Sequence, residues 1–221
     1  MTDKRPIIAI VDYGIGNLPS AQKAYERAGA DARITRDRRL IESADGVVLP
    51  GVGAMARCMQ SLDVFDMRGS TLDAIVSGRP FMGICVGMQM LHRGSDEHGG
   101  VEGLGVFDAV VRELPDNVKK PQMQWNIVRA IERSPVRQNV PRPPLLDDID
   151  GHWFYFVHSF APEDHADVIG TCDYGGPVSA VVGRGNVCGT QFHPEKSGTS
   201  GLALLANFVD MCRVGASVAT G

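Results

Sequence analysis

Cys85 has the sequence surroundings of a catalytic nucleophile. It lies between Gly83 and Gly87, where an apolar segment that begins at Pro80 changes from strand-like to helical spacing. A sharp turn between a strand and a helix exposes its central residue, and the two glycines remove side chains that would clash there. The N–H groups and dipole of the following helix favour a thiolate. The pattern predicts a cysteine nucleophile, although an isolated cysteine can also be a buried, inert thiol.

A base and an acid for this thiol occur far downstream, at His193 and Glu195. A thiol nucleophile needs a base, and the base needs a group that orients it. Residues two apart in an extended segment point the same way, so a strand end can direct His193 toward Cys85 with Glu195 behind the ring. Together the three residues predict a catalytic triad.

Backbone N–H groups for an oxyanion hole are predicted at the end of another buried strand. The segment 45–49 is followed by Pro50 and then by Gly51, Val52 and Gly53, whose N–H groups are free to face a ligand. Next to a cysteine turn, we interpret this segment as half of an oxyanion hole, with the N–H of Val86 as the other half. A plain glycine-rich turn is the alternative.

These motifs resemble those of the class I, or triad, glutamine amidotransferases, through Gly83–Gln89 and Phe192–Glu195. Further stretches resemble the glutaminase subunits of imidazole glycerol phosphate synthase in particular: Asp12–Leu18, Leu49–Gly53, Lys120–Asn126 and Tyr155–Ser159. The resemblance extends from about Ile7 to Cys212. One departure is Gln124, where the family usually has glycine, which puts the local turn there in doubt.

The resemblance implies an activity, a substrate and a partner. The chain would hydrolyse L-glutamine to glutamate and ammonia, with Gln89 and Glu97 around the substrate and Glu97 as the partner of its α-amino group. The ammonia would pass to a separate cyclase subunit, a (β/α)8 barrel, which makes imidazole glycerol phosphate and AICAR in histidine biosynthesis. The stretches expected to meet the barrel contain Gln122, Met123, Trp125, Asn126, Tyr155 and Lys196. No metal or organic cofactor is implied.

Length and composition favour one soluble, cytoplasmic domain. A chain of 221 residues suits a single domain, 1–221, with a core over about 7–212 and a frayed tail at 213–221. The net charge of −4 with mixed signs argues against a nucleic-acid partner, and no run is long enough to span a membrane. Five scattered cysteines without a C-x-x-C pair argue against a disulfide framework and a zinc site.

The order of elements predicts an α/β fold. Strand-like and helical segments alternate as far as Cys85, which predicts a central, mostly parallel sheet flanked by helices, with the site at the strand ends. From Phe107 onward, short β segments predict a subsidiary antiparallel region. The proline-rich segment 135–144 is expected to be an irregular loop, and Leu202–Cys212 a closing helix.

Three other functions remain open on these residues. The chain could be the glutaminase of another amidotransferase, a stand-alone cysteine hydrolase or peptidase on a similar fold, or a noncatalytic binding module. Activity toward glutamine compared with peptide esters separates the hydrolases, and rapid alkylation of Cys85 by a glutamine-analogue electrophile excludes the binding module.

Overall fold

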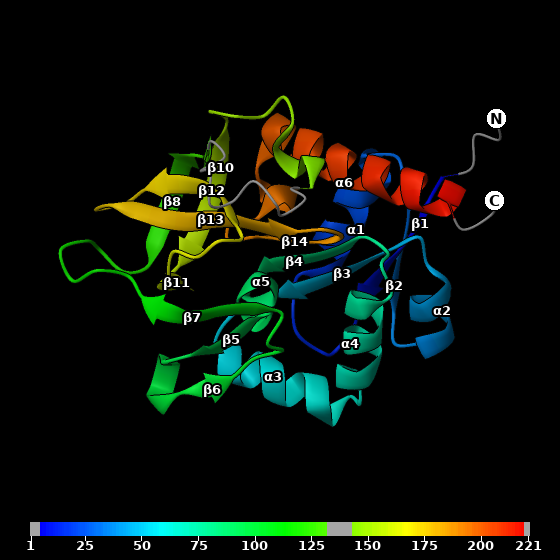
Figure 1. Ribbon diagram of the computed structural model, residues 1–221, viewed down its shortest axis with the longest axis horizontal. Helices are drawn as coiled ribbons and strands as arrows, with labels where there is room; N and C mark the ends of the chain where they lie inside the picture. Colours follow the sequence, from blue (N-terminus) through cyan, green and yellow to red (C-terminus); the bar gives the residue numbers. More distant parts are fainter. Residues whose placement is uncertain (1–4, 132–142, 219–221) are drawn as a thin grey trace.

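A central eight-stranded sheet forms the middle layer of the computed structural model, which describes residues 5–131 and 143–218 (Figure 1). Its strands are, in spatial order, β2 (Asp31–Thr35), β1 (Ile7–Val11), β3 (Gly46–Gly51), β4 (Phe81–Cys85), β14 (Val187–Thr190), β13 (Pro177–Arg184), β12 (Val168–Asp173) and β9 (Arg129–Ala130). The first five run parallel, and the remaining pairs are antiparallel. This confirms the predicted α/β class, with antiparallel strands added at one edge of the parallel sheet.

Helices cover both faces of this sheet. Figure 1 shows α1 (Leu18–Arg27) and α6 (Gly198–Val218) on one face. The other face carries α2 (Arg38–Ser43), α3 (Met55–Val64) and α4 (Arg68–Val76). The β-branched strands β1 and β3 are almost wholly buried because apolar helix faces pack on both sides of them. No helix in the described residues is long and apolar enough to cross a membrane.

Two smaller sheets lie beside the central one. One has the strand order β11 (Phe160–Pro162), β7 (Phe107–Glu113), β5 (His92–Ser95) and β6 (Val101–Glu102). The other is an antiparallel pair of β8 (Gln122–Ile127) and β10 (Trp153–His158). Gln124 lies inside β8, paired with Phe156, so this residue continues the strand and no turn occurs there.

The elements around Cys85 are packed at backbone contact distance. Strand β3 runs parallel to β4, and Gly51 is the register partner of Cys85. The short helix α5 (Val86–Met90) follows directly and crosses over the end of β3. A Cβ atom on Gly87 would lie 1.8 Å from the carbonyl oxygen of Leu49, so only glycine fits. The turn is thereby held against the neighbouring strand.

Some boundaries differ from the sequence predictions. Helix α6 spans Gly198–Val218, so it is longer at both ends than the closing helix predicted at Leu202–Cys212. The predicted fraying from residue 213 stays a prediction, and 219–221 lie outside the described residues. Arg213 stabilises the extension because its guanidinium binds Asp210 one turn back and the carbonyl of Gly29. The predicted loop at 135–144 lies outside the described residues as far as 142, and Pro144–Leu146 is a short 3₁₀ turn, η3.

Candidate active site

Cys85 occupies a strained turn at the carboxyl end of β4. Its φ of 55° and ψ of −113° are unusual for a residue with a side chain, and the residue is 3% exposed. This is the sharp strand-to-helix turn that the two glycines predict. Helix α5 has only five residues, roughly 1.4 turns, so its dipole contributes less to the sulfur than the sequence pattern suggests.

His193 and Glu195 lie just beyond β14 and are joined by a hydrogen bond. The distance from His193 Nδ1 to Glu195 Oε1 is 2.8 Å, and both side chains are about 95% buried. Glu195 reaches the ring through the 3₁₀ turn η4 (Pro194–Lys196) and not through the extended backbone inferred from spacing. A proton on Nδ1, directed at the carboxylate, leaves Nε2 available for chemistry.

The surroundings of His193 favour its protonated form. Burial lowers the pKa of this ring, but the contacts with Cys85 and Glu195 outweigh burial and raise the pKa to about 9. At neutral pH the imidazole is therefore cationic. A cation beside the sulfur supports a thiolate on Cys85, the form in which cysteine acts as a nucleophile.

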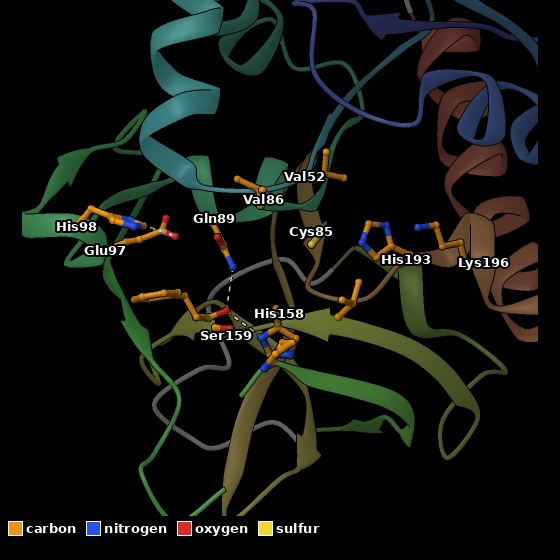
Figure 2. A pocket seen from close by; sticks show the side chains of 14 residues that line it. Val52, Cys85, Val86, Gln89, Glu97, His98, His158, Ser159, His193 and Lys196 are labelled. Atoms are coloured by element: carbon orange, nitrogen blue, oxygen red, sulfur yellow. Dashed lines mark hydrogen bonds and ion pairs between the residues drawn. The ribbon is translucent and has the colours of Figure 1, made fainter. Parts of the chain in front are cut away.

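Cys85 and His193 line one pocket of about 590 Å³ (Figure 2). Glu195 is outside that lining, bonded to Nδ1 of the His193 ring. Figure 2 shows Cys85 and His193 on one side, and Gln89 and Glu97 further along it. Among the residues singled out from the sequence, those that line it are Val52, Gly53, Cys85, Val86, Gln89, Glu97, His193 and Lys196. The pocket is large enough for an amino acid.

The segment predicted to form the oxyanion hole lies at the edge of this pocket. The Val52 carbonyl accepts a hydrogen bond from Cys58 Sγ at 3.3 Å, and the Pro50 carbonyl accepts one from the Tyr13 hydroxyl at 2.5 Å. In a trans peptide the carbonyl and the next N–H point in opposite directions, so the Gly53 N–H points away from Cys58. That the N–H groups of Gly51, Val52, Gly53 and Val86 bind the oxyanion stays a prediction.

Gln89 and Glu97 are both engaged with protein groups. The Gln89 amide nitrogen donates to the Phe160 carbonyl at 2.9 Å and to Gln191 Oε1 at 3.0 Å. Both of its protons are thus used, which leaves its oxygen as the group free for a ligand. Glu97 Oε2 accepts the Met55 N–H at 2.8 Å and so caps α3. Each residue can still offer an acceptor to a ligand.

Half of the residues predicted to meet a partner, Met123, Trp125 and Tyr155, lie on one face of the β8–β10 pair. Exposed fractions are 65% for Met123, 48% for Trp125 and 53% for Trp153, which the sequence analysis missed. Tyr155 is the register partner of Trp125, with ring centroids 6.1 Å apart. We call the surface formed by Met123, Trp125, Trp153 and Tyr155 the aromatic face.

The other predicted partner residues have different positions. Gln122 is wholly buried, so its side chain does not belong to the aromatic face. Asn126 is partly buried and donates from its amide to the Asp173 carbonyl at 2.8 Å. Lys196 is exposed and lines the pocket beside His193.

The backbone connects the aromatic face to the candidate triad. The Tyr155 carbonyl accepts the His193 N–H at 3.0 Å, and the Tyr155 N–H donates to Ser197 Oγ at 3.0 Å. The Ser197 hydroxyl in turn donates to the His193 carbonyl at 2.6 Å. A displacement of β10 would therefore be felt directly at His193.

Two polar side chains at the site have no obvious signal in the sequence. His158 lines the pocket, and its ring contacts the Phe160 carbonyl and Gln122 Oε1, each at 2.9 Å. Gln191 is fully buried, with its amide nitrogen 3.7 Å from Cys85 Sγ. The one usable clue was spacing, because Gln191 and His193 are two apart in an extended segment and so share a side.

Comparison with known proteins identifies the family of the chain. The sequence model of the family described as glutamine amidotransferase class-I matches residues 9–212. The chain belongs to this family. The cysteine turn and the His193–Glu195 pair of this amidotransferase both fall within the matched region.

Curated relatives match this chain over nearly their whole length. The protein named imidazole glycerol phosphate synthase subunit HisH from Acinetobacter baylyi is 44% identical over 208 residues, covering 92% of this chain and 97% of the relative. The protein of the same name from Rhodopseudomonas palustris is 46% identical over 215 residues, covering 91% and 97%.

Solved structures support the fold of this amidotransferase. A crystal structure of a glutamine amidotransferase superposes with a TM-score of 0.71 at 16% identity, covering 93% of this chain and 98% of that one. The PurLQS structure from Thermotoga maritima gives 0.69 at 17% identity, with the same coverage. At such identities the likeness concerns the fold alone.

Proposed function

We propose that this chain is the glutaminase subunit of imidazole glycerol phosphate synthase. It hydrolyses L-glutamine and passes the ammonia to a cyclase subunit in histidine biosynthesis. The observation that carries the proposal is that Cys85 and His193 line one pocket, with Glu195 hydrogen-bonded to His193. Identity of 44–46% to relatives named as this synthase subunit, over nearly the whole chain, supports the specific pathway.

In the proposed mechanism the nucleophile is Cys85. The proton is already on His193, so the thiolate attacks the side-chain amide carbon of glutamine to form a C–S bond. The resulting oxyanion is bound by the N–H groups of Val86 and of the segment 51–53. The C–N bond then breaks as His193 gives its proton to the departing nitrogen, which leaves as ammonia.

The remaining γ-glutamyl thioester is released by hydrolysis. His193 removes a proton from water, the water oxygen attacks the thioester carbon, and the C–S bond breaks. The sulfur leaves as a thiolate beside cationic His193, which restores the starting pair, and glutamate leaves after its new carboxyl group gives its proton to water. Glu195 keeps the ring oriented and stabilises its cationic form throughout, which is the part of the orienting acid in a triad.

The remaining acceptor atoms of the pocket suit the substrate amino group. The oxygen of Gln89 is one, because both protons of its amide nitrogen are engaged. The other is Glu97 Oε1, which lies 3.7 Å from His98 Nδ1, while Glu97 Oε2 already accepts from Met55. An ammonium group donates in three directions and accepts in none. We therefore assign these two residues to the α-amino end of glutamine, with the amide end at Cys85.

The partner is proposed to dock on the aromatic face and around Lys196. Tryptophan, tyrosine and methionine are enriched at protein interfaces, and an exposed group of them marks an interaction site. Ammonia becomes mostly ammonium in neutral water and loses its nucleophilicity, so the acceptor site must be close. A cyclase of (β/α)8-barrel type seated here would cover the mouth of the pocket. We assign this complex to the cytoplasm.

The proposed function is tested by reconstitution. The chain is mixed with cyclase subunits of several amidotransferase systems, and glutamate release and cyclised product are measured. We expect only the cyclase of imidazole glycerol phosphate synthase to stimulate glutamate release and to form product from glutamine. Stimulation by another synthase alone, or hydrolysis of peptide esters without any partner, would contradict the proposal.

A further inference from the structure

Gln191 directly follows β14, the strand next to β4 in the central sheet, and its side chain contacts the candidate nucleophile. Its backbone N–H is held by the Ala180 carbonyl at 2.8 Å, which fixes where the side chain begins. Its amide nitrogen then lies 3.7 Å from Cys85 Sγ, within hydrogen-bond range for sulfur. The residue is 0% exposed, so water does not compete for this contact.

The direction of the Gln191 amide is determined by a chain of contacts that ends at a backbone carbonyl. The Phe160 carbonyl can only accept, so the Gln89 atom 2.9 Å from it must be the donating nitrogen. The second proton of that nitrogen requires an acceptor, which is Gln191 Oε1 at 3.0 Å. The Gln191 nitrogen therefore faces the sulfur, and the reverse orientation would place two NH₂ groups against each other.

The Gln191 amide supplies a hydrogen-bond donor to Cys85 Sγ that the rest of the turn does not supply. A buried thiolate requires hydrogen bonds or charges to replace water. Helix α5 offers only five residues, and His193 must give up its charge when it protonates the leaving nitrogen. The amide of Gln191 does not titrate, so it can bond the sulfur in every step.

We propose that Gln191 is a positioning residue: its side-chain amide donates a hydrogen bond to Cys85 Sγ, stabilises the thiolate and holds the sulfur in its reactive orientation, with Gln89 keeping that amide in place. The inference rests on the proposed function, because it gives Gln191 a part in preparing Cys85 for attack on glutamine. It adds one side chain from the segment before His193 to the groups that act on the sulfur.

The test uses Gln191→Leu, which fills similar space without a donor, and Gln191→Met as a second variant in case the first does not fold. Iodoacetamide labelling of Cys85 is followed by mass spectrometry between pH 5 and 10. We expect the midpoint of the labelling profile to move to higher pH by about one unit, the effect of losing one hydrogen bond to a charged atom. For the same reason, kcat with glutamine should fall roughly 10-fold while KM changes little.

Gln22→Leu is the matched control. The amide of Gln22 donates to the Ala32 carbonyl at 2.9 Å, away from the pocket, so its removal should leave the labelling profile unchanged. A purely structural Gln191 predicts lower thermal stability but an unmoved labelling midpoint in both Gln191 variants, and that result overturns the inference.

Failure of the proposed function gives a different pattern. The unmodified chain with the cyclase would then release no glutamate, yet the labelling midpoint of Cys85 would still shift in the Gln191 variants. Labelling therefore reports on the hydrogen bond, and glutamate release reports on the reaction for which we propose it.

Discussion

The turn that carries Cys85 and the face that carries Trp125 differ in how far they tolerate a change of side chain. Around Cys85, β3, β4 and α5 approach so closely that a methyl group on Gly87 would overlap the Leu49 carbonyl. On the β8–β10 pair, Trp125 and Met123 project into open solvent. Tight packing holds the reacting atoms of the turn in one position. The exposed apolar side chains of the β8–β10 pair, in contrast, form a surface suited to binding a second molecule.

The largest expected effect is on chemistry at the turn. Cys85→Ala should lower glutamine-dependent turnover by roughly 10⁴-fold or more, because removal of a nucleophile abolishes the covalent route. The assembled complex should still form product from added ammonium salts, since the proposed function assigns the acceptor chemistry to the other subunit. Both rates are measured on the same preparation.

Cys212→Ala provides the control for this substitution. Cys212 is also fully buried but lies on α6, next to Gly46 and away from the pocket, so turnover should persist. Equal loss of the ammonia-dependent and glutamine-dependent rates in Cys85→Ala would make Cys85 a structural residue and contradict its assignment as nucleophile.

The next effect concerns packing at the turn. Gly87→Ala should lower the free energy of unfolding by roughly 3 kcal/mol or more, because the backbone of β3 cannot move away from a Cβ at 1.8 Å. Gly69→Ala is the matched change: nothing lies within 4 Å of its Cβ position inside α4, so it should stabilise by about 0.5–1 kcal/mol. Urea unfolding of both variants measures the difference, and similar values for both would contradict the packing argument.

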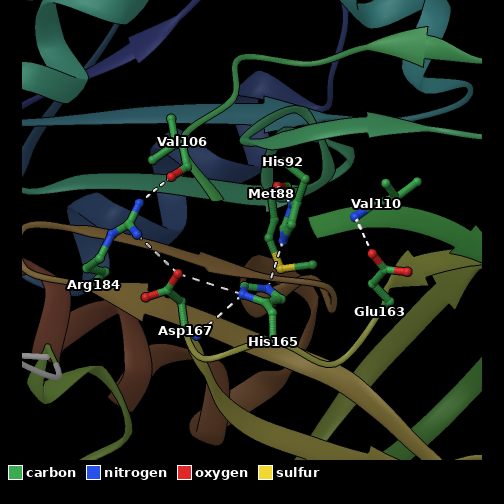
Figure 3. A network of polar contacts seen from close by, with 8 residues as sticks. All are labelled: Met88, His92, Val106, Val110, Glu163, His165, Asp167 and Arg184. Carbon is green, nitrogen blue, oxygen red and sulfur yellow. Dashed lines mark hydrogen bonds and ion pairs between the residues drawn. The ribbon is translucent and has the colours of Figure 1, made fainter. Parts of the chain in front are cut away.

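Buried histidines give a pH dependence of stability. Figure 3 shows His92 between the Met88 carbonyl and His165, with His165 in turn next to Asp167, which binds Arg184. The His92 ring nitrogens lie 3.0 Å from the Met88 oxygen and 3.2 Å from His165 Nε2. The Met88 carbonyl requires a proton on Nδ1, so Nε2 must accept from His165 and the His92 ring is neutral. Burial, with the charge of His165, lowers the pKa of His92 to about 4.

The expected stability profile follows from which state binds more protons. Burial also lowers the pKa of His158 to about 4. Between about pH 6.5 and 4, His92 and His158 are therefore protonated in the unfolded chain but neutral in the folded one, so acid favours unfolding. Their stabilisation is complete above about 6.5 and is lost as pH falls toward 4. His193 acts oppositely: its pKa of about 9 adds stability below 6.5 that is lost as pH rises through 9.

The histidines together predict maximal stability near pH 6.5. Urea unfolding at intervals between pH 4 and 9 measures the profile, and His92→Asn, which removes a titrating ring but can keep a donor for the Met88 carbonyl, should flatten the acid side. An acid side as steep in His92→Asn as in the unmodified chain would assign the loss to other groups.

Sequence could predict the candidate site where the signal was local. The turn at Cys85 and the pair His193 and Glu195 each lie within a few residues, and β-branched runs mark the buried strands. The hydrogen bonds of Gln89 could not be predicted in this way, because they reach Phe160 and Gln191, 71 and 102 positions away. Only the folded sheet brings these groups together.

The lengths of helices and strands could not be predicted from the sequence pattern either. Helix α5 ends at Met90 because the chain turns into β5, which pairs with β7, and this pairing has no periodic signal before His92. The aromatic face was found only in part: Trp125 and Tyr155 were recognised, but Trp153 joins them through the register of β10 against β8. Register depends on both strands and is invisible in either alone.

The smallest effect on the chain itself is expected at the aromatic face. Trp125→Ala removes a half-exposed ring whose described ring contact is with Tyr155, so the free energy of unfolding should change by no more than about 0.5–1 kcal/mol. Binding of the cyclase should weaken roughly 10-fold or more, because interface tryptophans are frequent hot spots. Titration calorimetry measures affinity, and thermal unfolding measures the fold.

Lys196→Ala and Val76→Ala complete this comparison. Lys196 is exposed and lines the pocket beside His193, so its removal should let ammonia escape and raise the ratio of glutamate formed to cyclised product. Val76 is 79% exposed at the end of α4, outside the proposed docking surface, and its truncation should change neither affinity nor that ratio. If Trp125→Ala and Lys196→Ala both bind tightly with unchanged stoichiometry, the cyclase docks elsewhere, and the exposed tryptophans need a different partner.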